Sequence, residues 1–93
     1  MMTPENLAER ILNSNCNNDN CLITWETIVK NNSIERLKLM KFELSKIVRN
    51  FLIDSILSLN SKEDIKKQLS ESLTKENVSN LTDKCILELK KVV

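Results

Sequence analysis

The sequence predicts an all-α fold, a small bundle of four to five helices around one long central helix at about residues 34–59. Three observations predict it. The chain of 93 residues contains no Gly and one Pro, which leaves few positions for the tight turns of β-hairpins. Apolar residues recur at intervals of three and four, the spacing of helices that bury one face. Finally, no Pro or Gly interrupts the stretch from Ser33, a good N-cap, to Asn60.

The predicted central helix has two apolar faces. At 100° per residue, one face carries a regular stripe, made of Leu37, Met40, Leu44, Ile47, Val48 and Phe51. A second, weaker stripe lies roughly opposite and consists of Leu39, Phe42, Ile53, Ile56 and Leu57. Because a helix with two apolar faces has to bury both, the second stripe is either further core or a surface for a partner. These five residues are the candidate partner-binding residues.

The segment before the central helix is predicted to hold two short helices. Thr3 and Pro4 form an N-cap followed by Pro in the first turn, which is a specific start signal for the first helix. An Asn-rich loop is expected at 13–21, because Asn and Asp side chains compete for backbone hydrogen bonds. The second helix is expected over residues 24–31, with Trp25 as a core residue.

Two further helices are predicted after the central one. Residues 61–64 resemble a capping box with Asp in place of Glu, and this predicts a helix over residues 62–73. Thr74 predicts that the last helix begins at residue 75, with a start at residue 81 as the alternative. This helix carries an apolar stripe of Val78, Leu81, Cys85, Leu89 and Val92. No repeat or long linker divides the chain, so we expect a single helical domain over 1–93.

Composition argues against an enzyme. The chain contains no His and no Tyr, which removes Ser-His and Cys-His pairs and every imidazole metal site. Composition leaves a Ser-Lys or carboxylate pair open, but the acidic residues mostly fall at helix starts or on polar faces, and the spacing of Cys16 and Cys21 matches no common zinc motif. We therefore predict no catalytic residue, no metal site and no cofactor. The three Cys are an odd number, which agrees with a reducing compartment. Cys16 and Cys21 are predicted to be free thiols, with a disulfide under oxidising conditions as the alternative, and Cys85 is predicted to be a small core residue.

The sequence also predicts an intracellular protein. The first ten residues, MMTPENLAER, lack the basic and apolar regions of a signal peptide. Charges at Lys46, Arg49 and Asp54 interrupt the apolar run far short of the ~20 residues that a membrane span needs. We expect a cytoplasmic or nuclear location and no membrane contact.

Charge is unevenly distributed, although the net charge is +1. Residues 1–29 hold one Arg and four acidic residues, a net charge of −3, whereas residues 30–50 hold six basic and two acidic residues, a net charge of +4. Lys38, Lys41 and Arg49 lie on one flank of the predicted central helix, within about 80° of each other. This flank could contact a nucleic-acid backbone. It lacks the interleaved aromatics of single-strand binders, so a solvated face is the preferred interpretation.

Residues 51–81 have a family resemblance. An apolar helix is followed by a polar corner, a helix with Ile65 and Leu69, and a turn with Leu73 and Glu76. This order resembles the helical N-terminal region of COMM-domain adaptor proteins. The resemblance covers about a third of the chain and rests on general helix patterning, and the COMM domain proper, which carries strands, is missing. It implies an assembly adaptor, and we assign no family on it.

The second apolar stripe decides the expected function. We expect a non-enzymatic protein–protein interaction module, an adaptor, assembly or regulatory subunit that binds a partner or itself through apolar helix faces. The alternative is a small nucleic-acid-binding regulator that uses the basic flank of the central helix.

Overall fold

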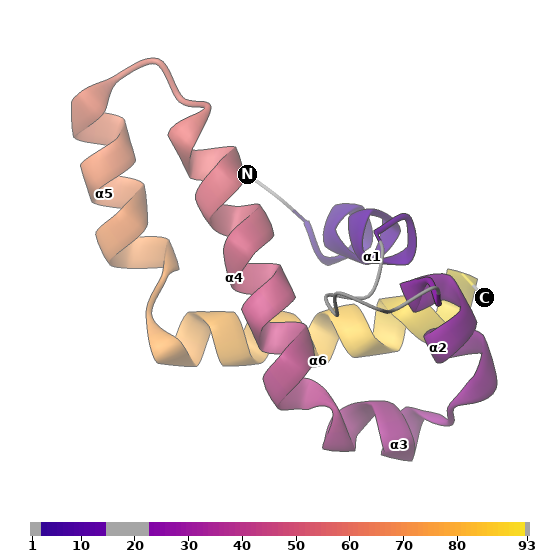
Figure 1. The fold of residues 1–93 in the computed structure, drawn as a ribbon. Helices are drawn as coiled ribbons and strands as arrows, with labels where there is room; N and C mark the ends of the chain where they lie inside the picture. Colours follow the sequence, from indigo (N-terminus) through magenta and orange to yellow (C-terminus); the bar gives the residue numbers. More distant parts are fainter. Residues whose placement is uncertain (1–2, 15–22, 93) are drawn as a thin grey trace.

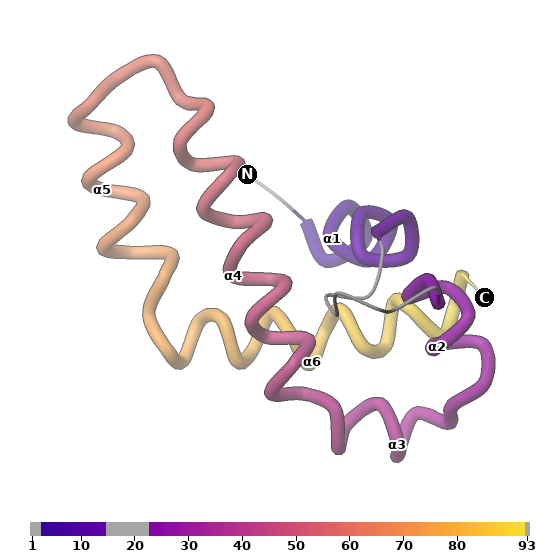
Figure 2. Tube along the Cα trace, viewed as in Figure 1, coloured from indigo at the N-terminus to yellow at the C-terminus, as the bar shows by residue number. Residues whose placement is uncertain are grey.

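The computed structural model describes residues 3–14 and 23–92, and within them the chain forms six helices and no strand (Figures 1 and 2). The all-α prediction is therefore confirmed. The predicted Asn-rich loop at 13–21, with Cys16 and Cys21, lies mostly outside the described residues. In chain order the helices are α1 (Pro4–Leu12), α2 (Trp25–Asn31), α3 (Ile34–Leu39), α4 (Lys41–Leu57), α5 (Lys62–Ser72) and α6 (Lys75–Val92).

Hydroxyl side chains cap five of these helices at the residues that the sequence predicted. In each case the hydroxyl oxygen accepts a hydrogen bond from the backbone N–H three residues later, at 3.1–3.4 Å. These bonds satisfy donors that the first helical turn leaves free, and so they fix where each helix begins. The capping residues are Thr3, Thr24, Ser33, Ser61 and Thr74.

The core lies against α6, which runs across the base of the domain and contacts α1, α2, α3 and α4 (Figure 1). Its most extensive neighbour is α1, from the other end of the chain. Ile86 and Leu89 of α6 are fully buried, as are Leu7 and Ile11 of α1. The predicted stripe of the last helix is thus the main packing surface, although Val92 at its end is exposed.

The predicted central helix is two helices. Met40 has φ −92° and ψ 10°, and it separates α3 from α4, which begins without a side-chain cap. Neither Pro nor Gly marks this turn, so its cause is tertiary packing. The turn allows Leu37 on α3 and Leu44 on α4 to be buried together in the core, while Leu39 beside the turn is 81% exposed.

The helices α4 and α5 form an antiparallel pair that projects from the rest of the domain (Figures 1 and 2). The pair accounts for the elongated shape, with extents of 42 × 25 × 20 Å. No residue of α5 is fully buried, and Ile65 and Leu69 are half-buried. Because little apolar surface is buried there, α5 is the least firmly packed helix of the domain.

The short helix α2 is held by its buried aromatic residue and by bonds at its end. Trp25 is 4% exposed, which confirms it as a core residue. Lys90 Nζ of α6 donates to the Val29 carbonyl at 3.0 Å, and Asn32 Nδ2 donates to the Ile28 carbonyl at 2.7 Å. Both bonds satisfy carbonyls that the end of a helix leaves free.

Among the described residues, every helix is too short or too polar to cross a membrane.

The packing predicts a sharp contrast between two leucines of α6. Leu89→Ala should lower the free energy of unfolding by about 3 kcal/mol, because it removes a fully buried side chain and leaves a cavity. The matched variant Leu87→Ala, at a residue that is 49% exposed, should change it by less than about 1 kcal/mol. Urea unfolding followed by circular dichroism measures both. Equal losses would contradict the assigned register of α6.

The indole of Trp25 predicts a second contrast. Its Nε1 is buried and has no hydrogen-bond partner among the described residues. Trp25→Phe removes this unsatisfied donor together with some apolar area, so the two effects partly offset and stability should change by less than about 1.5 kcal/mol. Trp25→Ala should cost about 3–5 kcal/mol. A Phe variant as unstable as the Ala variant would mean that the N–H has a partner.

Candidate partner-binding surface

The structure places the five candidate partner-binding residues in different environments. Leu39, Phe42 and Leu57 are 81%, 69% and 57% exposed. Ile53 is half-buried, whereas Ile56 is 6% exposed and is therefore not part of the surface. Leu39 lies on α3, beyond the turn at Met40, because the predicted helix is interrupted there. The exposed stripe is thus carried mainly by α4.

One face of α4 combines apolar and basic side chains. Its members are spaced by four, three, four and four residues, which at 100° per residue places them within about 80° of each other. All are exposed except the half-buried Ile53. We call this set the α4 outer face, and it consists of Phe42, Lys46, Arg49, Ile53 and Leu57. Arg49 of the predicted basic flank therefore lies on the same face of α4 as Phe42, Ile53 and Leu57 of the second apolar stripe.

A groove of about 720 Å³ lies beside this face, between α4 and the start of α6. The chain turns from α5 into α6 at one end of the groove, and Leu73 and Lys75 from this turn line it together with residues of α4. We call this the α4–α6 groove. Its lining residues are Lys41, Phe42, Ser45, Lys46, Arg49, Leu73, Lys75, Val78 and Ser79.

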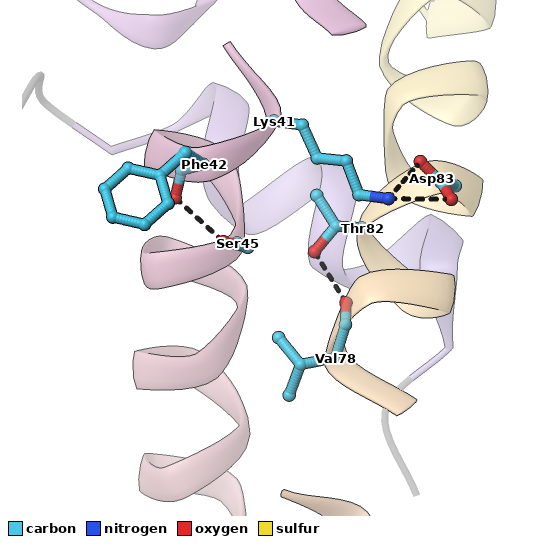
Figure 3. A network of polar contacts seen from close by, with 6 residues as sticks. All are labelled: Lys41, Phe42, Ser45, Val78, Thr82 and Asp83. Atoms are coloured by element: carbon cyan, nitrogen blue, oxygen red, sulfur yellow. Dashed lines mark hydrogen bonds and ion pairs between the residues drawn. The ribbon is translucent and has the colours of Figure 1, made fainter. Parts of the chain in front are cut away.

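The groove has a positive lining, with four cationic side chains and no acidic one. Lys41 Nζ reaches from α4 to Asp83 of α6 and lies 3.0 Å from both carboxylate oxygens, so its charge is neutralised (Figure 3). Lys46 lies 3.9 Å from Glu43, and both side chains are well exposed, so this pair is weak. For Arg49 and Lys75, the described part of the chain provides no ion-pair partner.

The ring of Phe42 is held next to a cation. Figure 3 shows the ring extending from α4 away from the Lys41–Asp83 pair. Lys46 Nζ lies 4.3 Å from the ring centroid, a cation–π contact worth about 0.5–1 kcal/mol at an exposed site. The pair presents an exposed aromatic surface and a positive charge together.

Hydroxyl groups at the groove are used within the helices. Ser45 Oγ donates to the Phe42 carbonyl at 2.8 Å, and the buried Thr82 Oγ1 behind the wall donates to the Val78 carbonyl at 2.7 Å (Figure 3). Such bonds to the preceding turn satisfy the hydroxyl protons. The groove therefore offers apolar contact and positive charge to a ligand, with few neutral donors.

The predicted basic flank is only partly assembled. Lys41 and Arg49 both line the α4–α6 groove, but Lys38 lies on α3 and does not line it. Sequence reasoning did not place Leu73, Lys75 or Val78 at the site. These residues are far from α4 in the sequence, and no sequence pattern indicates that they line a groove together with α4.

A second hollow, of about 480 Å³, lies between α6, Ile34 and the start of α1. Its lining mixes acidic and basic residues, and Lys91 Nζ is paired with Glu88 Oε1 at 3.1 Å. Because these charges compensate each other, we expect this hollow to discriminate less between anionic and cationic ligands than the α4–α6 groove does.

Cys85 is a core residue, as predicted, with 1% exposure. Burial raises the pKa of its thiol from 9.0 to about 12, and the negative charges of Glu88 and Glu5 add to the increase. The thiol is therefore protonated at neutral pH and is a poor nucleophile. Among the described residues, no three Cys, Asp or Glu side chains are grouped so that they could hold a metal ion.

Comparison of the chain with protein-family models, with curated protein sequences and with solved structures gives no match. The resemblance to COMM-domain adaptors thus receives no support, and function has to be inferred from geometry and charge.

The raised pKa of Cys85 predicts a loss of stability in alkali. The folded state keeps the thiol proton up to about pH 12, whereas the unfolded state loses it near 9.0. The unfolded chain therefore binds fewer protons between these values, and the free energy of unfolding falls as pH rises through this window. Below pH 9 this contribution is constant.

Urea unfolding at a series of pH values from about 8 to 11 measures this slope, with Cys85→Ala as the control that lacks the thiol. The difference in stability between the two proteins should shift steadily in favour of Cys85→Ala above about pH 9. A difference that does not change with pH would show that the thiol titrates normally in the folded chain.

Proposed function

We propose that this chain is a non-enzymatic interaction module that binds a protein partner through the α4 outer face and the α4–α6 groove. The observation that carries the proposal is the exposure of Phe42, at 69%, beside a groove of about 720 Å³. Aromatic residues are enriched in interface cores and among the residues that dominate binding energy. Burying such a side chain stabilises a complex by about 1.5–3 kcal/mol.

The surroundings of Phe42 support the proposal. Leu57 is exposed on the same face of α4, and Leu39 is exposed on the adjoining helix. Single exposed apolar residues are ordinary, but several at helical spacing on one face are typical of a binding surface. Such a module suits an adaptor, assembly or regulatory subunit. The odd number of cysteines favours an intracellular setting for it.

A second candidate is a nucleic-acid-binding regulator. The exposed Lys46, Arg49 and Lys75 around the groove favour it, because cationic side chains contact phosphates without regard to sequence. The neutralisation of Lys41 by Asp83 and the single aromatic residue in the lining weigh against it. Photo-crosslinking with and without nuclease separates the two candidates.

Site-specific photo-crosslinking tests the proposed function. The photo-reactive residue p-benzoylphenylalanine replaces Phe42 or Leu57 on the α4 outer face, and Val92 of α6 as the matched control. Val92 is also an exposed apolar residue, and it lines neither the groove nor the second hollow. In lysate of the source cells, adducts at 42 and 57 should exceed those at 92, because the photo-reactive group captures only molecules that are in contact with it.

The adducts also identify the class of partner. Protein adducts that survive nuclease treatment support the interaction module, and an adduct of twice the chain's own mass identifies self-association. Adducts that disappear with nuclease would favour the nucleic-acid candidate. Equal yields at all three positions would overturn the proposal, because the outer face would then be no more occupied than an ordinary surface.

A further inference from the structure

The charge around the groove points to the chemistry of the partner. We propose that the α4–α6 groove binds an acidic amphipathic helix of a partner protein, an inference that rests on the proposed function. Lys46, Arg49 and Lys75 are exposed and surround the groove, and no acidic residue lines it. Opposite charge at the rim of an interface raises the rate and specificity of association, so carboxylates on the partner complement this rim.

The interior of the groove is apolar. Val78 is 8% exposed and forms part of its floor, Leu73 is half-buried, and Phe42 stands exposed at its edge. An apolar centre with a charged rim has the anatomy of a protein interface. The complementary ligand therefore carries apolar side chains on one side and carboxylates beside them, as an acidic amphipathic helix does.

The length of the surface favours a helix over a small anion. The α4 outer face continues from Phe42 beyond the groove to Leu57, which at 1.5 Å per residue is about 22 Å. The exposed apolar side chains of Phe42 and Leu57 lie at the two ends of this face. A free phosphate or carboxylate would occupy only one end, whereas a helix of about 15 residues spans the whole face with contacts at helical spacing.

The same charges argue against a second copy of this chain as the occupant. In a two-fold symmetric dimer, the outer face would meet itself, and Lys46 and Arg49 of one copy would approach those of the other. Like charges brought together at an interface are unfavourable. For a nucleic acid, the groove lining offers a single aromatic side chain, Phe42, on which a base could stack.

A pair of model peptides tests the inference. Each is a fluorescein-labelled helix of about 15 residues with Leu at helical spacing on one face, and its remaining face carries Glu in one peptide and Lys in the other. Fluorescence anisotropy at low salt measures binding to the whole chain. The Glu peptide should bind on the order of tenfold more tightly than the Lys peptide, because three exposed ion pairs together provide roughly that factor. Added salt should weaken its binding.

Charge reversal locates the binding. The groove variant Lys46→Glu, Arg49→Glu, Lys75→Glu should lose about tenfold in affinity for the Glu peptide and bind the Lys peptide better. The matched variant Lys62→Glu, Lys66→Glu, Lys67→Glu changes the net charge equally on exposed residues of α5 that do not line the groove. This matched variant should still bind the Glu peptide more tightly than the Lys peptide, as the unaltered chain does. Because all six residues are exposed, both variants should fold, and circular dichroism checks this.

Three results would overturn the inference. These are equal binding of the two peptides, equal effects of the two triple variants, and binding of a labelled oligothymidylate in preference to the Glu peptide. Photo-crosslinking at position 42 keeps this failure distinct from failure of the proposed function. A crosslinked protein segment that is neutral or basic would support the interaction module and contradict the acidic helix. The absence of a specific adduct would contradict the interaction module itself.

Discussion

The contact between α1 and α6 is the constraint on which the rest of the structure depends. It joins the two ends of the described chain, and the Sγ of Cys85 lies 3.7 Å from the carbonyl oxygen of Pro4, 81 residues away in sequence. The apolar face of α6 also receives α2, α3 and α4. The burial of that face therefore depends on helices from both ends of the described chain.

The position of the candidate surface follows from this constraint. One side of α4 packs on α6, with Leu44 and Val48 buried in the core. On its way back to α6, the chain passes through α5, whose end brings Leu73 and Lys75 beside α4. Phe42 on the outer face of α4 remains 69% exposed, and the groove lies between α4 and the start of α6. The surface is thus a consequence of how α4, α5 and α6 are connected.

Two hypotheses that looked exclusive in the sequence share one surface in the structure. The apolar stripe favoured a protein partner and the basic flank favoured a nucleic acid, but Phe42, Lys46 and Arg49 lie on the same face. The cation–π contact between Lys46 and Phe42 ties the two properties together. A surface of this kind suits a partner that is apolar and acidic at once, and a protein segment combines these properties more readily than a phosphate backbone.

The sequence by itself determined the all-α class, the starts of five of the six described helices and much of the core. Thr3, Thr24, Ser33, Ser61 and Thr74 cap the helices as predicted, because capping depends on a side chain and a backbone amide only three residues apart. The buried positions of Trp25, Cys85 and Leu89 likewise follow from local periodicity.

Tertiary structure alone decided the turn at Met40, the burial of Ile56 and the presence of Leu73 and Lys75 at the groove. The turn carries no Pro or Gly, and it accompanies the burial of Leu37 on α3 and Leu44 on α4 in one core. Ile56 belongs by periodicity to the second stripe, yet it is buried. Periodicity describes the faces of a single helix, whereas burial depends on which of those faces another helix covers. That choice is made by contacts between residues far apart in the chain, which local pattern does not encode.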